Sequence, residues 1–200
     1  AMACRSASQK SEQVLDMALE ASKIFRKHDN KTYMAIAFDV LGEITRFHGD
    51  FRASKKYFQD SLSLSQETGE ILLEASLHAN LGLLAFQQDE HENAYERNKK
   101  GLSISADIEA PFRKAYHLAL LAGPIAALGF PERAARILGA ATKEFEKLGF
   151  EQMASEQTEV DLYISYAQNL LEKKAFQEAW GEGEQMMIDD AVAYALSELS

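Results

Sequence analysis

The feature that most constrains this chain is a segment that recurs three times at a spacing of 40 residues. Residues 41–62 read LGEITRFHGDFRASKKYFQDSL, and the later copies lie at 81–102 and 121–142. A period of this length is typical of repeat arrays, in which each unit buries its apolar face against its neighbours. The sequence therefore predicts one repeat array over residues 11–200.

Each copy contains two segments with helical periodicity, in which apolar residues recur every three or four positions. The chain has only three prolines, and Ala, Leu, Glu, Lys and Gln, which favour helix, are abundant. The short turns between segments force consecutive helices to lie antiparallel. We expect an all-α fold, a right-handed α-α superhelix with 40-residue repeats and about ten antiparallel helices.

The period also divides the chain into regular and irregular parts. We expect a disordered N-terminal segment, a half-repeat, three full repeats and an atypical C-terminal cap, because terminal repeats commonly differ from interior ones. These parts cover residues 1–10, 11–30, 31–70, 71–110, 111–150 and 151–200, in that order.

The third repeat contains Gly123 and Pro124 inside its first helix. Proline removes a backbone donor and clashes with the preceding turn, so this pair is expected to kink or break the helix. Whether it marks a functional break stays open at the level of sequence.

Composition and charge exclude several kinds of partner. The net charge is −10, and residues 101–200 hold 8 Lys/Arg against 16 Asp/Glu, so no basic surface is expected for nucleic acid or an anionic membrane. The single cysteine, Cys4, excludes an intrachain disulfide and fits a reducing compartment. No apolar run is long enough to span a membrane, and a cytoplasmic location is expected.

The repeat resembles the tetratricopeptide repeat. Leu41-Gly42 matches positions 7 and 8 of that motif, and Ser54, Ala94 and Ala134 match its small residue at position 20. The usual period of that family is 34 residues, so this chain would be a variety with longer helices. The resemblance implies a superhelix whose concave face binds protein segments.

The C-terminal part resembles the helical region of large bacterial LuxR-type/ATPase transcriptional regulators. The matching runs lie at residues 131–141, 175–180 and 189–196. Those proteins carry an ATPase module before the repeats and a DNA-binding helix-turn-helix after them. Neither motif is visible here, so the resemblance implies a regulatory relationship without those two activities.

The tetratricopeptide resemblance implies a partner-binding groove on the first helix of each repeat. Asp39 and Glu43 stand where the family's clamp for a C-terminal carboxylate needs Lys and Asn, which argues against an acidic peptide tail as the ligand. The residues predicted to line the groove are Ile36, Asp39, Glu43, Arg46, Phe47, Ser76, Leu83, Phe86, Gln87 and Tyr116.

No constellation of residues predicts catalysis, a cofactor or a metal ion. The five histidines form no pair at metal-ligand spacing, and the Gly181–Glu184 segment (GEGE) is interpreted as a helix-end turn. We therefore expect a non-catalytic protein-protein interaction or regulatory scaffold module, related to or part of a bacterial regulator. Its partner would be a protein, a peptide or another domain of the same regulator, and a homodimer stays open. The alternative is a small-molecule effector-sensing domain, with Gly123-Pro124 opening the cavity.

Overall fold

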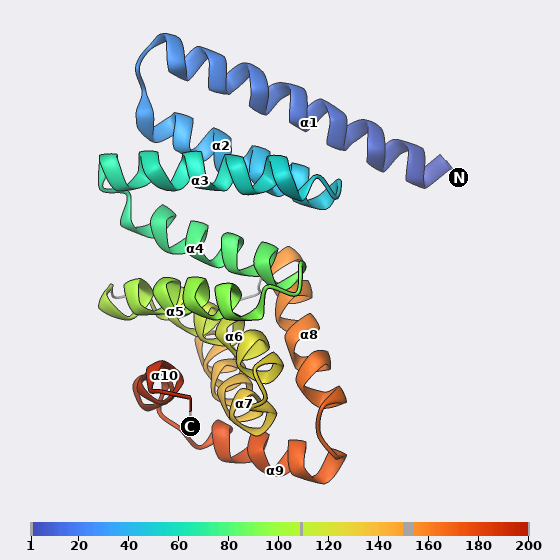
Figure 1. Cartoon of the computed structure of the whole chain (residues 1–200), viewed down its shortest axis with the longest axis vertical. Helices are drawn as coiled ribbons and strands as arrows, with labels where there is room; N and C mark the ends of the chain where they lie inside the picture. Colours follow the sequence, from blue (N-terminus) through green and yellow to red (C-terminus); the bar gives the residue numbers. More distant parts are fainter. Residues whose placement is uncertain (1, 109, 150–153, 200) are drawn as a thin grey trace. The chain divides into compact units, whose positions relative to one another are not determined.

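The computed structural model describes residues 2–108, 110–149 and 154–199, and this part of the chain forms ten α-helices and no strand (Figure 1). The predicted all-α class is confirmed. In chain order the helices are α1 (Met2–Lys27), α2 (Lys31–Phe47), α3 (Phe51–Thr68), α4 (Ile71–Phe86), α5 (His91–Asp107), α6 (Pro111–Ala127), α7 (Pro131–Leu148), α8 (Ala154–Asn169), α9 (Lys173–Glu184) and α10 (Ile188–Leu196).

The helix starts follow the 40-residue period of the sequence. First helices begin at Lys31, Ile71 and Pro111, and second helices begin at Phe51, His91 and Pro131. The side chain of Asn30 accepts a hydrogen bond from Tyr33 N at the start of α2, and that of Asp50 accepts one from Ala53 N at the start of α3. Pro111 and Pro131 begin the two helices of the third repeat. Each takes the first helical position, where a missing N–H costs nothing.

The first helix is longer than expected. Residues 1–10 are expected to be disordered and the half-repeat to begin at residue 11, whereas α1 begins at Met2. Residues 2–10 contain no proline or glycine that would end a helix. The periodic apolar pattern begins only after this stretch, which is why the pattern alone does not extend the helix to Met2.

The contacts divide the chain into two compact units, residues 1–84 and 85–200, which are described separately here. In the first unit, Phe38 and Leu41 of α2 pack against Ala18 of α1 and against Tyr57 and Leu64 of α3. A second cluster joins α3 to α4 and contains Phe58, Leu77, Leu81 and Leu84. The continuous domain over residues 11–200 stays a prediction.

Small residues at helix crossings allow the helices to pack closely. A β-carbon added to Gly42 of α2 would collide with the ring of Phe58 from α3. Ser54, Ala94 and Ala134, the small residues of the second helices, are all fully buried. The size limit at these positions therefore comes from the neighbouring helix.

In the second unit, α9 lies directly against α7. A β-carbon on Gly183 would meet the carbonyl oxygen of Arg136, and one on Gly139 would meet that of Trp180. The prediction of a turn at residues 181–184 is wrong, because this segment is the last turn of α9. Its glycines suggest a turn in the sequence, but Gly183 serves the backbone contact with α7.

We predict opposite effects for alanine at the two glycines of this segment. Gly183→Ala should destabilise the second unit by about 1–3 kcal/mol, because the overpacked contact is with backbone and cannot be relieved by a rotamer change. Gly181→Ala is the matched control: nothing lies within 4 Å of its added β-carbon, and helix propensity should stabilise it slightly. Urea denaturation would measure the stability of both variants. Equal midpoints would contradict the close backbone contact at Gly183.

The prediction that Gly123-Pro124 breaks the helix is wrong, because α6 is an unbroken helix from Pro111 to Ala127. Pro124 cannot donate to the carbonyl of Leu120, the residue four positions earlier. The buried side chain of Asn98, from α5, donates to Leu120 O with an Nδ2–O distance of 2.7 Å. The other two repeats carry Phe58 and Leu138 at the equivalent position. The second repeat therefore has the amide of Asn98 where the other two repeats have an apolar side chain. This amide donates to the Leu120 carbonyl, which has lost its helical donor because of Pro124.

This replacement can be tested with a double-mutant cycle. Asn98→Leu should cost about 1–3 kcal/mol, because it leaves a buried carbonyl without a donor. Pro124→Ala restores the amide N–H, so the same leucine substitution should cost clearly less in that background. Chemical denaturation of the four proteins would give the coupling energy. An equal cost in both backgrounds would show that Asn98 does not compensate for the proline.

Candidate partner-binding face

The first unit carries an exposed apolar face on α2. Ile36 and Phe47 are 44% and 66% exposed, and Glu43 lies exposed between them along the helix. Tyr33 and Val40 are exposed as well. Positions 33, 36, 40, 43 and 47 follow the helical period and therefore share one side of α2. We call these five residues the α2 face.

The predicted groove residues Ile36, Glu43 and Phe47 thus belong to an accessible surface. Tyr33 and Val40 were missed, although their spacing of three and four residues from Ile36 was the signal that could have found them. Tyr33 stacks on Phe25 of α1 with ring centroids 5.2 Å apart. This contact holds one end of the α2 face in place.

Polar residues next to the α2 face are already engaged within the first unit. Asn80 Nδ2 donates to Asp39 Oδ1 at 2.9 Å, which ties α4 to α2. Arg46 is buried, and its guanidinium lies 4.6 Å from the centroid of the Phe47 ring. The prediction that Arg46 lines an open groove is therefore wrong, because most of this side chain packs among its neighbours.

The groove predicted on α4 is largely absent. Leu83 is only 1% exposed, so it belongs to the core and cannot contact a partner. Ser76 is half-buried and donates to Leu72 O at 3.1 Å. Gln87, just after the helix, is the accessible member of this set. The motif positions show which residues share one side of α4, but they do not show whether other helices cover that side.

In the second unit, α8 covers the predicted groove. The Tyr163 ring meets the Phe86 ring edge-on with centroids 4.9 Å apart, and Tyr166 does the same at 5.3 Å. Tyr163 also occupies the space beside Gly123, where a β-carbon would collide with its ring. Phe86 is consequently buried, and its prediction as a partner contact is wrong.

Tyr116 is buried in the same covered groove. Its hydroxyl donates to Glu159 Oε2 of α8. Burial raises the pKa of Tyr116 well above its usual range, and the negative charge of Glu159 and the hydrogen bond to it act in the same direction. The prediction that Tyr116 lines an open groove is wrong because the chain itself supplies the segment that occupies it.

The raised pKa of Tyr116, caused chiefly by burial, predicts a loss of stability in alkaline solution. The folded pKa of Tyr116 lies above the unfolded value, so its contribution is complete below pH of about 10 and declines as the pH rises further. Tyr116→Phe should make the fall in unfolding free energy above that pH shallower than in the wild-type protein. Denaturation at several pH values would measure the slopes, with the exposed Tyr33→Phe as control. Identical slopes for all three proteins would contradict the predicted contribution of Tyr116.

Two surface clefts lie near the C-terminal helices of the second unit. The lining of one includes Leu171, Phe176 and Trp180, and the rings of Phe176 and Trp180 have centroids 5.5 Å apart. Trp180 is half-buried. The other contains Arg133, whose guanidinium donates to backbone carbonyls of Tyr194, Ser197 and Glu198 at the end of α10.

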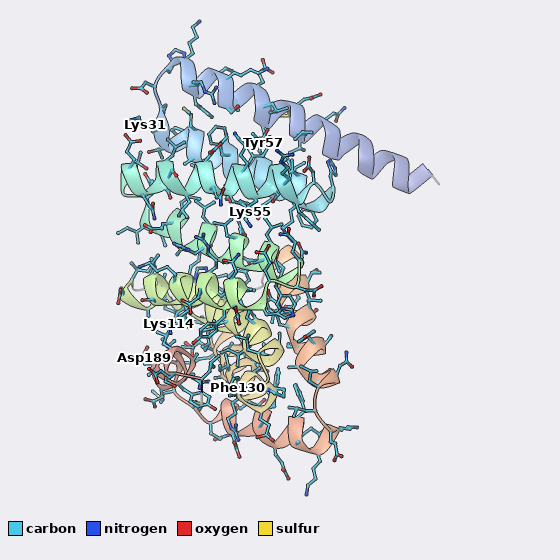
Figure 2. The ribbon with its side chains drawn as sticks, in the orientation of Figure 1. Lys31, Lys55, Tyr57, Lys114, Phe130 and Asp189 are labelled. Atoms are coloured by element: carbon cyan, nitrogen blue, oxygen red, sulfur yellow. The ribbon has the colours of Figure 1, made fainter. Side chains whose placement is uncertain are left out.

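The second cleft is therefore formed by a structural contact. Arg133 satisfies carbonyls at the C-terminal end of α10, where a positive charge is favourable. At the other end, Lys114 Nζ of α6 lies 2.8 Å from Asp189 Oδ1 of α10 (Figure 2). That pair lowers the pKa of Asp189, chiefly through the hydrogen bond. Both ends of α10 are thus held to the second unit by charged side chains.

Two other kinds of feature are absent from the described residues. Among the described residues, no group of three or more His, Cys, Asp or Glu side chains is placed to hold a metal ion. Within the described part of the chain, no helix has the length and apolar character needed to cross a membrane.

Comparisons with known proteins give a likeness of fold. No family model matches the sequence, and no curated protein matches it. Among solved structures, the chain is similar to the crystal structure of BtubC (BKLC) from P. vanneervenii, with a TM-score of 0.60 and 19% sequence identity. The match covers 92% of this chain and 89% of that one. At this identity the likeness supports an all-α helical-repeat fold and carries no statement about activity.

Proposed function

We propose that the chain is a non-catalytic protein-binding module built from tetratricopeptide-like repeats in a right-handed superhelix. Its partner is a protein or peptide segment, or another domain of the same regulator, that binds on the α2 face. The observation that carries the proposal is the exposure of Phe47, Ile36, Val40 and Tyr33 on one side of a helix whose other side is packed.

The α2 face has the properties of a binding surface for a short segment. Its five residues extend over about 21 Å of helix, which matches a short peptide. Large apolar side chains gathered on one side are costly to leave in water and mark interaction sites. Glu43 lies among them, so the face combines apolar side chains with one carboxylate.

The sequence left a small-molecule sensor as the alternative. The sensor hypothesis depended on a cavity opened by Gly123-Pro124. The Tyr163 ring takes up the space beside Gly123, where that cavity was expected. We therefore prefer the protein-binding function. The relationship to bacterial LuxR-type/ATPase regulators and the cytoplasmic location stay predictions that rest on the sequence. The absence of a catalytic role likewise stays a proposal.

Affinity capture with matched surface variants would test the α2 face. The wild-type chain and a variant with Ile36→Ser and Phe47→Ser would be used as baits in bacterial extract, with bound proteins quantified by mass spectrometry. A protein that binds through this face should be depleted at least tenfold by the variant, because a tenfold loss corresponds to about 1.4 kcal/mol and truncation of a hot-spot residue costs about 2 kcal/mol or more.

The control bait carries Met187→Ser, which removes an apolar side chain of similar exposure, 71%, from the second unit. It should capture the same protein as the wild type. Circular dichroism melts would verify that all three baits are folded. Equal capture by the wild type and the double variant would contradict the proposed face.

A further inference from the structure

The first helix of the chain has two apolar sides, and α2 covers only one of them. Ala18 is buried against Phe38 and Leu41, with Leu15 and Leu19 beside it. On the other side, Val14, Met17 and Ile24 are exposed, Met17 by 69%. Together with the half-buried Ala21, these three residues recur at helical spacing and form what we call the outer α1 face.

The repeat period shows what covers this side in an equivalent helix. Adding 40 to Val14, Met17, Ala21 and Ile24 gives Ser54, Tyr57, Ser61 and Leu64 of α3. In α3 this side packs on α2, the first helix of the same repeat. Tyr57 contacts Phe38 with ring centroids 6.0 Å apart, Ser61 Oγ donates to Ala35 O at 2.7 Å, and Leu64 joins the same cluster.

The opposite sides of α1 and α3 also correspond when 40 is added to the residue number. Ala18 of α1 packs on α2, the helix that follows it, and its counterpart Phe58 of α3 packs on α4. Each of these second helices thus has one side for the following helix and one side for the preceding helix. In α1 the side for a preceding helix is apolar and exposed.

We propose that the outer α1 face is a docking site for an amphipathic α-helix of the first-helix type, supplied by another protein. Such a helix presents the pattern that α2 presents to α3: a small residue, then Phe or Leu three positions later, and Leu three positions after that, as in Ala35, Phe38 and Leu41. This site lies on α1 and does not depend on the function proposed for the α2 face.

The chemistry of the outer α1 face narrows the kind of partner. Ala21 replaces Ser61 of α3, so the hydroxyl that bonds Ala35 O has no counterpart, and the contact would be made by apolar groups. The small Ala21 at the middle of the face leaves room for the bound helix to approach α1 closely, as small residues do at the internal crossings.

A peptide taken from the chain itself provides the probe. We would use residues 30–48 with a fluorescein at the N-terminus and a hydrocarbon link replacing Ile36 and Val40, which are exposed on α2. The link holds the peptide helical, so that binding is not lost to the cost of helix formation. Fluorescence anisotropy would follow its titration with the full chain.

The expected result is saturable binding to the wild-type chain that becomes at least tenfold weaker for a chain carrying Met17→Glu and Ile24→Glu. A chain with Val40→Glu alters the α2 face instead and should bind the peptide as the wild type does. A peptide with Phe38→Glu and Leu41→Glu should not bind. Circular dichroism would verify that the variant chains are folded.

Several results would overturn the proposal. Absence of saturable binding, equal binding by the Met17→Glu/Ile24→Glu chain, or loss of binding with Val40→Glu would each do so. Sedimentation equilibrium of the chain alone gives a further check. A wild-type dimer that the Met17→Glu/Ile24→Glu chain cannot form would mean that a second copy, and not a first-type helix, occupies the outer α1 face.

Discussion

The contact between the Tyr163 ring and Gly123 decides how the second unit can be used. Because Gly123 has no side chain, α8 can lie close against α6 with its aromatic residues pointing into what would otherwise be the groove. Phe86 and Tyr116 are buried as a consequence. The accessible apolar side chains of the predicted groove are therefore confined to α2, in the first unit. The position of one glycine thus determines which part of the array presents a free face.

Much of the repeat architecture could be predicted from the sequence because it depends on local signals. The 40-residue period located the helix starts, and the size limits at Gly42 and Ser54 followed from comparing equivalent positions. The path of α8 could not be predicted in this way. Its place depends on Tyr163 meeting Gly123 and Phe86, residues far away in the sequence, and no periodic pattern records which side of a helix a later segment will cover.

Glycine and proline caused the other errors, for a common reason. In an isolated helix, Gly123-Pro124 and the glycines of the 181–184 segment would interrupt the hydrogen-bonded turns, which is what the sequence predicts. In the folded chain, each irregularity is matched by a neighbour: Tyr163 fills the space at Gly123, Asn98 donates to the carbonyl that Pro124 leaves unpaired, and Gly183 meets the backbone of α7. The local cost is real, and tertiary contacts outweigh it.

The hydrogen bond from Asn98 also gives the array a fixed order. Asn98 belongs to the second repeat and Pro124 to the third, whereas Phe58 and Leu138 stand at the position of Asn98 in the other two repeats. If the second and third repeats exchanged places, the amide would face a helix without a proline, and the proline would face an apolar side chain. The repeats are similar in length and pattern, yet they are not interchangeable modules. Tandem duplication of either one during evolution would add a copy whose donor or acceptor has no counterpart.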